Sequence, residues 1–264
     1  MEENQVKPFQ KYSLEEHTYQ AENALEIRFG ETKGFHSSYK VVIQETENDD
    51  QTKNWLVEKI EDAPLPSENN FMEILHELEK NSYPVKIKVD EKGVFLNAID
   101  HQKNIEGWKQ KTEHIHEKYD NSELFRNQYL AVFEDEELFY KNKLKEPFWN
   151  LLLFAPSYVD NGGKNQESIA WNIKGIGNIE CPGIIRAEQR DYGFDAFFTS
   201  ETIIPDNIKE EIDKKYLRQA GQYKAELTIQ MQYNSRKRQY AKKKADFIIL
   251  DGDKIVYQET SSII

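Results

Sequence analysis

The residues best suited to chemistry form a basic cluster late in the sequence. Six cationic side chains fall between positions 234 and 246: Arg236, Lys237, Arg238, Lys242, Lys243 and Lys244. Nucleic-acid binding requires a wide basic surface, because affinity comes from neutralising many phosphates. The chain instead carries a formal net charge of -12. We therefore expect a solvated hairpin tip whose best functional use is docking a protein partner, an acidic one included, and we do not expect a nucleic-acid partner.

Metal and thiol chemistry lack the partners they need. His114 and His116 are two positions apart, whereas zinc ligands on a helix are three or four apart so that they share a face. The sequence therefore predicts no metal site. Cys181 is the single cysteine, which excludes an intrachain disulfide. We expect it to be a small buried side chain.

Signatures of catalysis and of cofactor binding are also missing from the sequence. The acidic runs EDEEL and ETENDD are expected among 47 acidic residues, and sequence alone cannot place two carboxylates across a cleft. KGIGNIE has neither the third glycine nor the following helix of a dinucleotide-binding loop, and no GxSxG motif occurs. We predict a protein that is not an enzyme and has no cofactor, and keep an enzyme with a dispersed site as a third alternative.

One apolar run could bind a ligand. PFWNLLLFAPSY contains the candidate pocket residues Phe148, Trp149, Leu152 and Phe154. Helices over a curved antiparallel sheet often enclose such a pocket, and this reading gives the alternative function, a carrier of a hydrophobic small molecule beneath the middle helices. A chain of this size also needs a large apolar cluster for stability, so we favour a core contact.

The periodicity of apolar residues predicts the elements that hold these side chains. Two-residue alternation indicates strands, and spacings of three and four indicate helices. We expect strands at 24–30, 37–47, 53–62, 168–180, 183–191, 193–202 and 222–233, hairpins at 84–100 and 245–259, helices at 69–81 and 204–221, and a helical middle at 101–156. Short connections imply antiparallel pairing. The predicted fold is α+β, with a broad antiparallel sheet and a central helical block packed on one face.

Domain organisation follows from the same pattern and from charge. Residues 1–140 hold 30 acidic and 16 basic side chains, whereas residues 141–264 hold 17 and 19. We expect a flexible segment at 1–20, an α+β half at 21–158 and a sheet with one helix at 159–264, packed together as one globular unit. The two halves repeat an order of strands and helices, which raises the possibility of an internal duplication.

Composition bounds location and function. No apolar run approaches the roughly 20 residues that span a bilayer, and the first residues do not resemble a signal peptide. We expect a cytoplasmic protein without membrane contact, and the frequent Lys, Asn, Ile and Glu suggest a bacterial one. The predicted function is protein–protein interaction, as an assembly component or an inhibitor or immunity-type partner, with self-association as an option.

Overall fold

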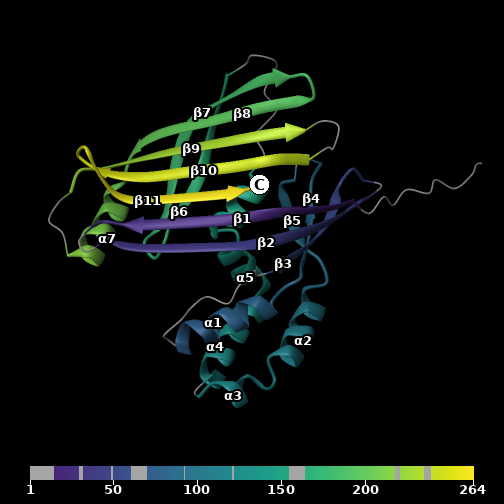
Figure 1. Cartoon of the computed structure of the whole chain (residues 1–264). Helices are drawn as coiled ribbons and strands as arrows, with labels where there is room; N and C mark the ends of the chain where they lie inside the picture. The colour runs from purple at the N-terminus through teal and green to yellow at the C-terminus, as the bar shows by residue number, and fades with distance from the viewer. Residues whose placement is uncertain are drawn as a thin grey trace, which may run out of the picture. The chain divides into compact units, whose positions relative to one another are not determined.

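An antiparallel sheet of eleven strands is the main element of the fold (Figure 1). The computed structural model describes residues 15–29, 32–48, 50–60, 70–91, 93–120, 122–154, 164–217, 221–234 and 239–264. The strands are β1 (Glu15–Ile27), β2 (Lys33–Glu47), β3 (Lys53–Ile60), β4 (Val85–Val89), β5 (Phe95–Ala98), β6 (Lys164–Ile173), β7 (Gly177–Arg190), β8 (Gly193–Ile203), β9 (Tyr223–Asn234), β10 (Gln239–Asp251) and β11 (Lys254–Ile263). The helices are α1 (Asn70–Asn81), α2 (His101–Lys111), α3 (Ile115–Lys118), α4 (Ser122–Glu134), α5 (Glu136–Lys143), α6 (Pro147–Leu153) and α7 (Asp206–Tyr216).

The strand order is β5-β4-β3-β2-β1-β11-β10-β9-β8-β7-β6. Each strand therefore pairs with its neighbour in the sequence, except where the helices α2 to α6 separate β5 from β6 and where β1 meets β11. The predicted α+β class with a broad antiparallel sheet is confirmed. Across the sheet, the strand numbers fall from β5 to β1 and then from β11 to β6. An internal duplication remains a prediction.

Alternation along the strands assigns one face of the sheet to the core. On β9, the buried residues are Tyr223, Ala225, Leu227, Ile229 and Met231. On β10, the residues in phase with them are Lys243, Ala245, Phe247 and Ile249, all buried as well. We call the face that carries these side chains the inner face, and the opposite face the outer face.

The chain divides into two compact units. Unit 1 comprises Met1–Thr18, Val42–Lys59 and Ser67–Tyr129, and unit 2 comprises Tyr19–Val41, Ile60–Pro66 and Leu130–Ile264. The predicted boundary at 158/159 remains a prediction. Residues 21–27 of β1 pair with β11, so an early strand belongs with the late part of the chain.

Unit 1 packs two helices on its strands. β4 buries Val85, Ile87 and Val89 completely, as the alternating VKIKV sequence requires. The indole Nε1 of Trp108 in α2 donates a hydrogen bond to the carbonyl of Leu78 in α1 at 2.9 Å. The buried Trp108 ring therefore joins the two helices.

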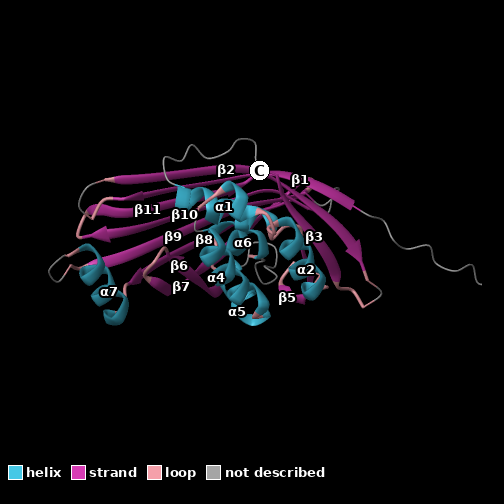
Figure 2. Ribbon diagram, turned by 90° about the horizontal axis from the view of Figure 1, so that it is seen from below, coloured by secondary structure: helices cyan, strands magenta, loops and turns pink. Residues whose placement is uncertain are grey.

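In unit 2, the edge of the sheet formed by β7 and β6 folds back over the inner face. β6 pairs only with β7 among the described strands, yet its Trp171 stacks on Phe247 of β10, with ring centroids 5.8 Å apart. Strands in a flat sheet are about 4.8 Å apart, so β6 reaches β10 only because the sheet curls. Figure 1 shows β6 passing behind β9 to β11, and Figure 2 shows α6 and α7 on the same side of these strands.

Several predicted boundaries need correction. β1 already begins at Glu15, inside the segment predicted to be flexible, and residues 1–14 lie outside the described residues. The helical middle is interrupted, because Asp135 caps α5 by accepting a hydrogen bond from the Leu138 amide at 2.9 Å and Pro147 starts α6. The turn between the two predicted strands lies earlier than expected, between Ile173 and Gly177, so β7 runs without a break through Cys181. α7 ends at Tyr216 rather than at Gly221.

Candidate functional site

The described part of the basic cluster lies on β10, which pairs antiparallel with β9. Arg236, Lys237 and Arg238 fall outside the described residues. Lys242 and Lys244 are half-buried on the outer face, where Lys244 forms an ion pair with Asp246 at 2.8 Å. Whether this hairpin docks a partner remains a prediction.

Lys243 does not contribute to that surface, which corrects its assignment as a partner-binding residue. Its side chain is 4% exposed, and its Nζ donates hydrogen bonds to the carbonyls of Leu152 at 2.6 Å and Phe154 at 2.8 Å. A cation at the last carbonyls of a helix is stabilised by the helix dipole, so Lys243 fastens α6 to β10. Burial lowers the pKa of Lys243 to about 7.

The four candidate pocket residues lie in the core of unit 2. Phe148, Trp149 and Leu152 are buried, and Phe154 is half-buried. Phe148 makes edge contacts with Tyr39 and Trp149, and Phe154 contacts Phe198. The apolar run thus supplies the core contact that the sequence favoured.

Other titratable groups are placed without forming a reactive centre. His114 contacts Glu117 at 3.1 Å, and both are exposed. Cys181 is buried as expected, and burial raises the pKa of its thiol to about 12. Across the described residues, no group of three or more His, Cys, Asp and Glu side chains could hold a metal ion. Nor does any helix in this part of the chain have the length and apolar character needed to cross a membrane.

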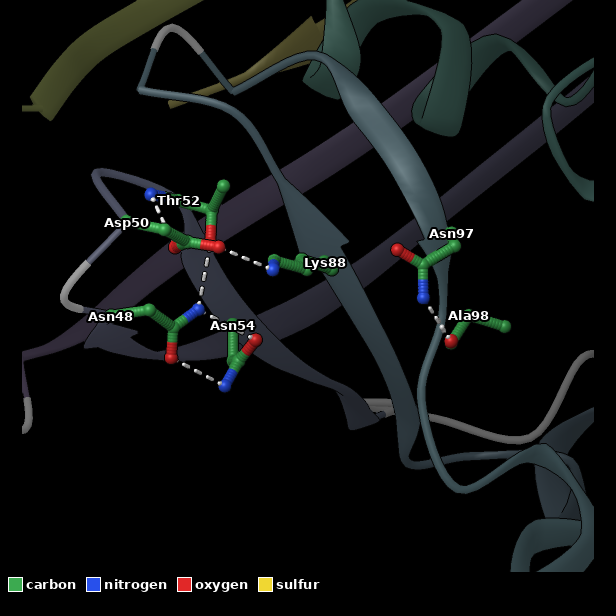
Figure 3. A network of polar contacts seen from close by, with 7 residues as sticks. All are labelled: Asn48, Asp50, Thr52, Asn54, Lys88, Asn97 and Ala98. Carbon is green, nitrogen blue, oxygen red and sulfur yellow. Dashed lines mark hydrogen bonds and ion pairs between the residues drawn. The ribbon is translucent and has the colours of Figure 1, made fainter.

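A polar network in unit 1 fixes the turn between β2 and β3 (Figure 3). The side-chain amides of Asn48 and Asn54 bond each other in both directions, at 3.0 and 3.1 Å. Asp50 accepts hydrogen bonds from Lys88 at 2.8 Å and from the hydroxyl and amide of Thr52. The bond from Lys88, followed by those from Thr52, lowers the pKa of Asp50. These groups satisfy one another, so we assign the network a structural role.

One end of unit 2 carries several exposed apolar side chains. The register pairs Ile203 with Lys224, Tyr223 with Asp251 and Asp251 with Lys254, so the connections β8–α7–β9 and β10–β11 share one end of the sheet. The β1–β2 connection and the β6–β7 turn lie there too, since Ile27 pairs with Tyr257. We call this end the rim and define it by its exposed apolar residues Phe35, Ile203 and Leu217, which are 53%, 83% and 93% exposed.

Aromatic and polar contacts hold the base of the rim. Phe29, after β1, stacks on Tyr216 of α7 at 4.3 Å. The Tyr223 hydroxyl donates to Asp213 of α7 at 2.6 Å. Lys215 donates to the carbonyls of Lys174 and Gly175 in the β6–β7 turn. These contacts order the segments that carry the apolar tips before any partner arrives.

Leu217 occupies a strained backbone conformation. Its φ and ψ are 54° and 40°, in the left-handed region, and its amide donates to the Asp213 carbonyl to end α7. A branched residue there costs roughly 1 kcal/mol relative to glycine, and Leu217 gains no burial in return. Leu217 is therefore an exposed apolar side chain in a strained backbone conformation.

The sequence signals for the rim were weak. Ile203 and Leu217 flank α7, and the predicted helix 204–221 included Leu217. Only the observed end of α7 at Tyr216 moves Leu217 to the surface.

Comparisons with known proteins add little to the geometry. No family model matches the sequence, and no curated protein sequence matches it either. Among solved structures, a chain from a structure described as lipid–protein interactions in lipovitellin is similar, with a TM-score of 0.43 and 10% identity. The match covers 94% of this chain and 25% of that chain, so this chain spans a quarter of its length.

Proposed function

We propose that this protein acts by binding another protein and that the rim is its docking surface. The observation that supports this proposal is the exposure of Ile203 and Leu217, which have the two highest exposed fractions among the large hydrophobic residues described. Buried apolar anchors supply most of the affinity at protein interfaces. The exposed side chains of Ile203 and Leu217 could insert into an apolar pocket on the surface of a partner.

The charges around the rim indicate how such a complex responds to salt. Lys174, Lys214 and Lys215 lie close to acidic residues of the same end, among them Asp213 and Asp251. A rim with both signs of charge gives little electrostatic steering, so apolar contact should dominate and binding should change little with ionic strength. Docking through the basic hairpin would instead weaken steeply as salt is added.

Site-specific photo-crosslinking in cells separates these two surfaces. A crosslinking residue at Leu217 or Ile203 reports on the rim, and one at Ala241, an exposed position beside the basic hairpin, is the matched control. We expect the same protein to be crosslinked from both rim positions and not from Ala241. Crosslinking from Ala241 alone would move the docking surface to the hairpin, and no defined product from any position would refute the proposal.

The partner identified in this way can then be titrated against purified variants. Leu217→Gly removes the apolar tip and relieves the left-handed strain, so it should leave the fold as stable as before or raise its free energy of unfolding by roughly 0.5–1 kcal/mol. We expect its Kd to rise at least about tenfold, which is the usual effect of losing an anchor. A Kd equal to that of the parent protein would exclude Leu217 as an anchor.

A further inference from the structure

The β6–β7 hairpin is held onto the inner face of unit 2 by a small number of long-range contacts. Trp171 of β6 stacks on Phe247 of β10 and donates its indole hydrogen to Glu259 of β11 at 3.1 Å. At the end of β6, the amide of Lys174 donates to the Tyr257 hydroxyl at 3.3 Å. β6 has a paired strand on one side only, so these contacts, with the clamp from Lys215, keep the hairpin closed.

The acceptor in the central contact is a carboxyl group in the interior. Glu259 is 2% exposed and lies in phase with Phe247 and Tyr257 on the inner face. The side chain of Asn23 in β1 hydrogen-bonds the Glu259 carboxyl group and accepts a hydrogen bond from Ser261 at 2.9 Å. In the described part of the chain, no Lys, Arg or His forms an ion pair with Glu259.

The polar groups that act on Glu259 come from three strands. β6 supplies Trp171 and, farther away, the cation of Lys174; β11 supplies Tyr257; and β1 supplies Asn23, which hydrogen-bonds the carboxyl group. Burial raises the pKa of Glu259 to about 7, although the hydrogen bonds with Trp171 and Asn23 and the charge of Lys174 act in the opposite direction. A neutral carboxyl group is compatible with this interior, whereas an ionised one requires water or a cation.

We infer that the β6–β7 hairpin is a proton-controlled flap, which stays closed while Glu259 is protonated and opens transiently when Glu259 releases its proton to solvent. Opening lets water reach the carboxylate and separates Trp171 from Phe247. The inference does not depend on partner binding at the rim, because every contact in it lies within unit 2 and is present without a partner.

Hydrogen exchange as a function of pH tests the flap. Protection factors, corrected for intrinsic exchange, are compared for the amides of β6 and of β9, a strand paired on both sides, at pH 5.5 and 8. We expect the β6 protection to fall by roughly tenfold to a hundredfold relative to β9, the range that a carboxyl pKa raised by two to three units allows. An equal response in both strands would overturn the inference.

Three variants identify the titrating group. Glu259→Gln keeps an acceptor for Trp171 but cannot ionise, so the pH response of β6 should disappear. Glu45→Gln changes a carboxylate of unit 1 and should leave the response intact. Trp171→Phe keeps an aromatic ring but loses the indole donor, so β6 should exchange faster at both pH values. A wild-type response in Glu259→Gln would overturn the inference, and if that variant does not fold, the wild-type and Trp171→Phe measurements still decide it.

Discussion

Each unit contains an inner-face glutamate that accepts a hydrogen bond from a tryptophan indole. In unit 1, Glu45 accepts from Trp55 at 2.8 Å and also forms an ion pair with Lys53 at 2.8 Å. In unit 2, Glu259 accepts from Trp171 at 3.1 Å without such a cation. The residue types are the same, and the difference lies in the third partner.

The comparison shows how a single cation changes the role of a buried acid. Glu45 has Lys53 as an ion-pair partner and joins the adjacent strands β2 and β3. Glu259 instead joins β6 to β11, strands that are far apart in the sheet. The Trp171–Glu259 contact, which we infer to depend on protonation of Glu259, thus joins two strands that do not pair with each other.

The largest expected effect concerns the two indoles. Trp171→Ala removes a fully buried ring and should lower the free energy of unfolding by about 4 kcal/mol, whereas Trp55→Ala, at a half-buried ring, should cost about half as much. Urea denaturation followed by circular dichroism measures both. Equal losses would mean that the indole of unit 2 is no more important than its counterpart.

Smaller effects are expected from the carboxyl groups, with opposite signs in the two units at pH 8. The folded-state pKa of Glu259 lies above its ordinary value of 4.5, at about 7, so the stability it contributes is full below pH 4.5 and is lost as the pH rises to 7. Glu259→Gln should therefore raise the free energy of unfolding by about 2 kcal/mol at pH 8 and change it little near pH 4.5.

Glu45→Gln is the matched variant, and it should lower the free energy of unfolding by about 1 kcal/mol at pH 8 because Lys53 loses its partner. Lys243, whose pKa burial lowers to about 7, is present in both variants and cancels from their difference. The same denaturation series at several pH values measures the effect. Two curves of the same sign at pH 8 would remove the distinction between the pairs.

The smallest effect should come from Lys174, the distant cation of the unit 2 pair. Its charge lowers the pKa of Glu259, so Lys174→Met should raise that pKa by less than about one unit. A carbon-detected NMR titration of the Glu259 side chain measures the midpoint directly. A shift downward would show that other groups control this carboxyl.

The sequence predicts much of the fold because local rules determine it. Alternation located β9 and β10, and the DGDK turn located the β10–β11 hairpin. The same alternation could have removed Lys243 from the candidate surface, since it is in phase with Ala245 and Phe247. Because Lys243 stands between Lys242 and Lys244, it was grouped with them as a surface residue.

What the sequence could not predict depends on contacts between distant segments. Trp171 and Glu259 are 88 positions apart, and no local pattern relates them. The exposure of Leu217 depends on where α7 ends, and helix ends are set by caps and tertiary contacts as much as by composition. The pairing of β1 with β11 likewise becomes visible only once the sheet is assembled.

The pairing of β1 with β11 has a consequence for how the chain folds. β11 lies between β10 and β1, and Ser261 bonds Asn23 across 238 positions. During synthesis on a ribosome, β1 cannot pair with β11 until β11 has been made. Such distant pairing slows folding, so the β1–β11 pair should form later than the local hairpins of unit 2.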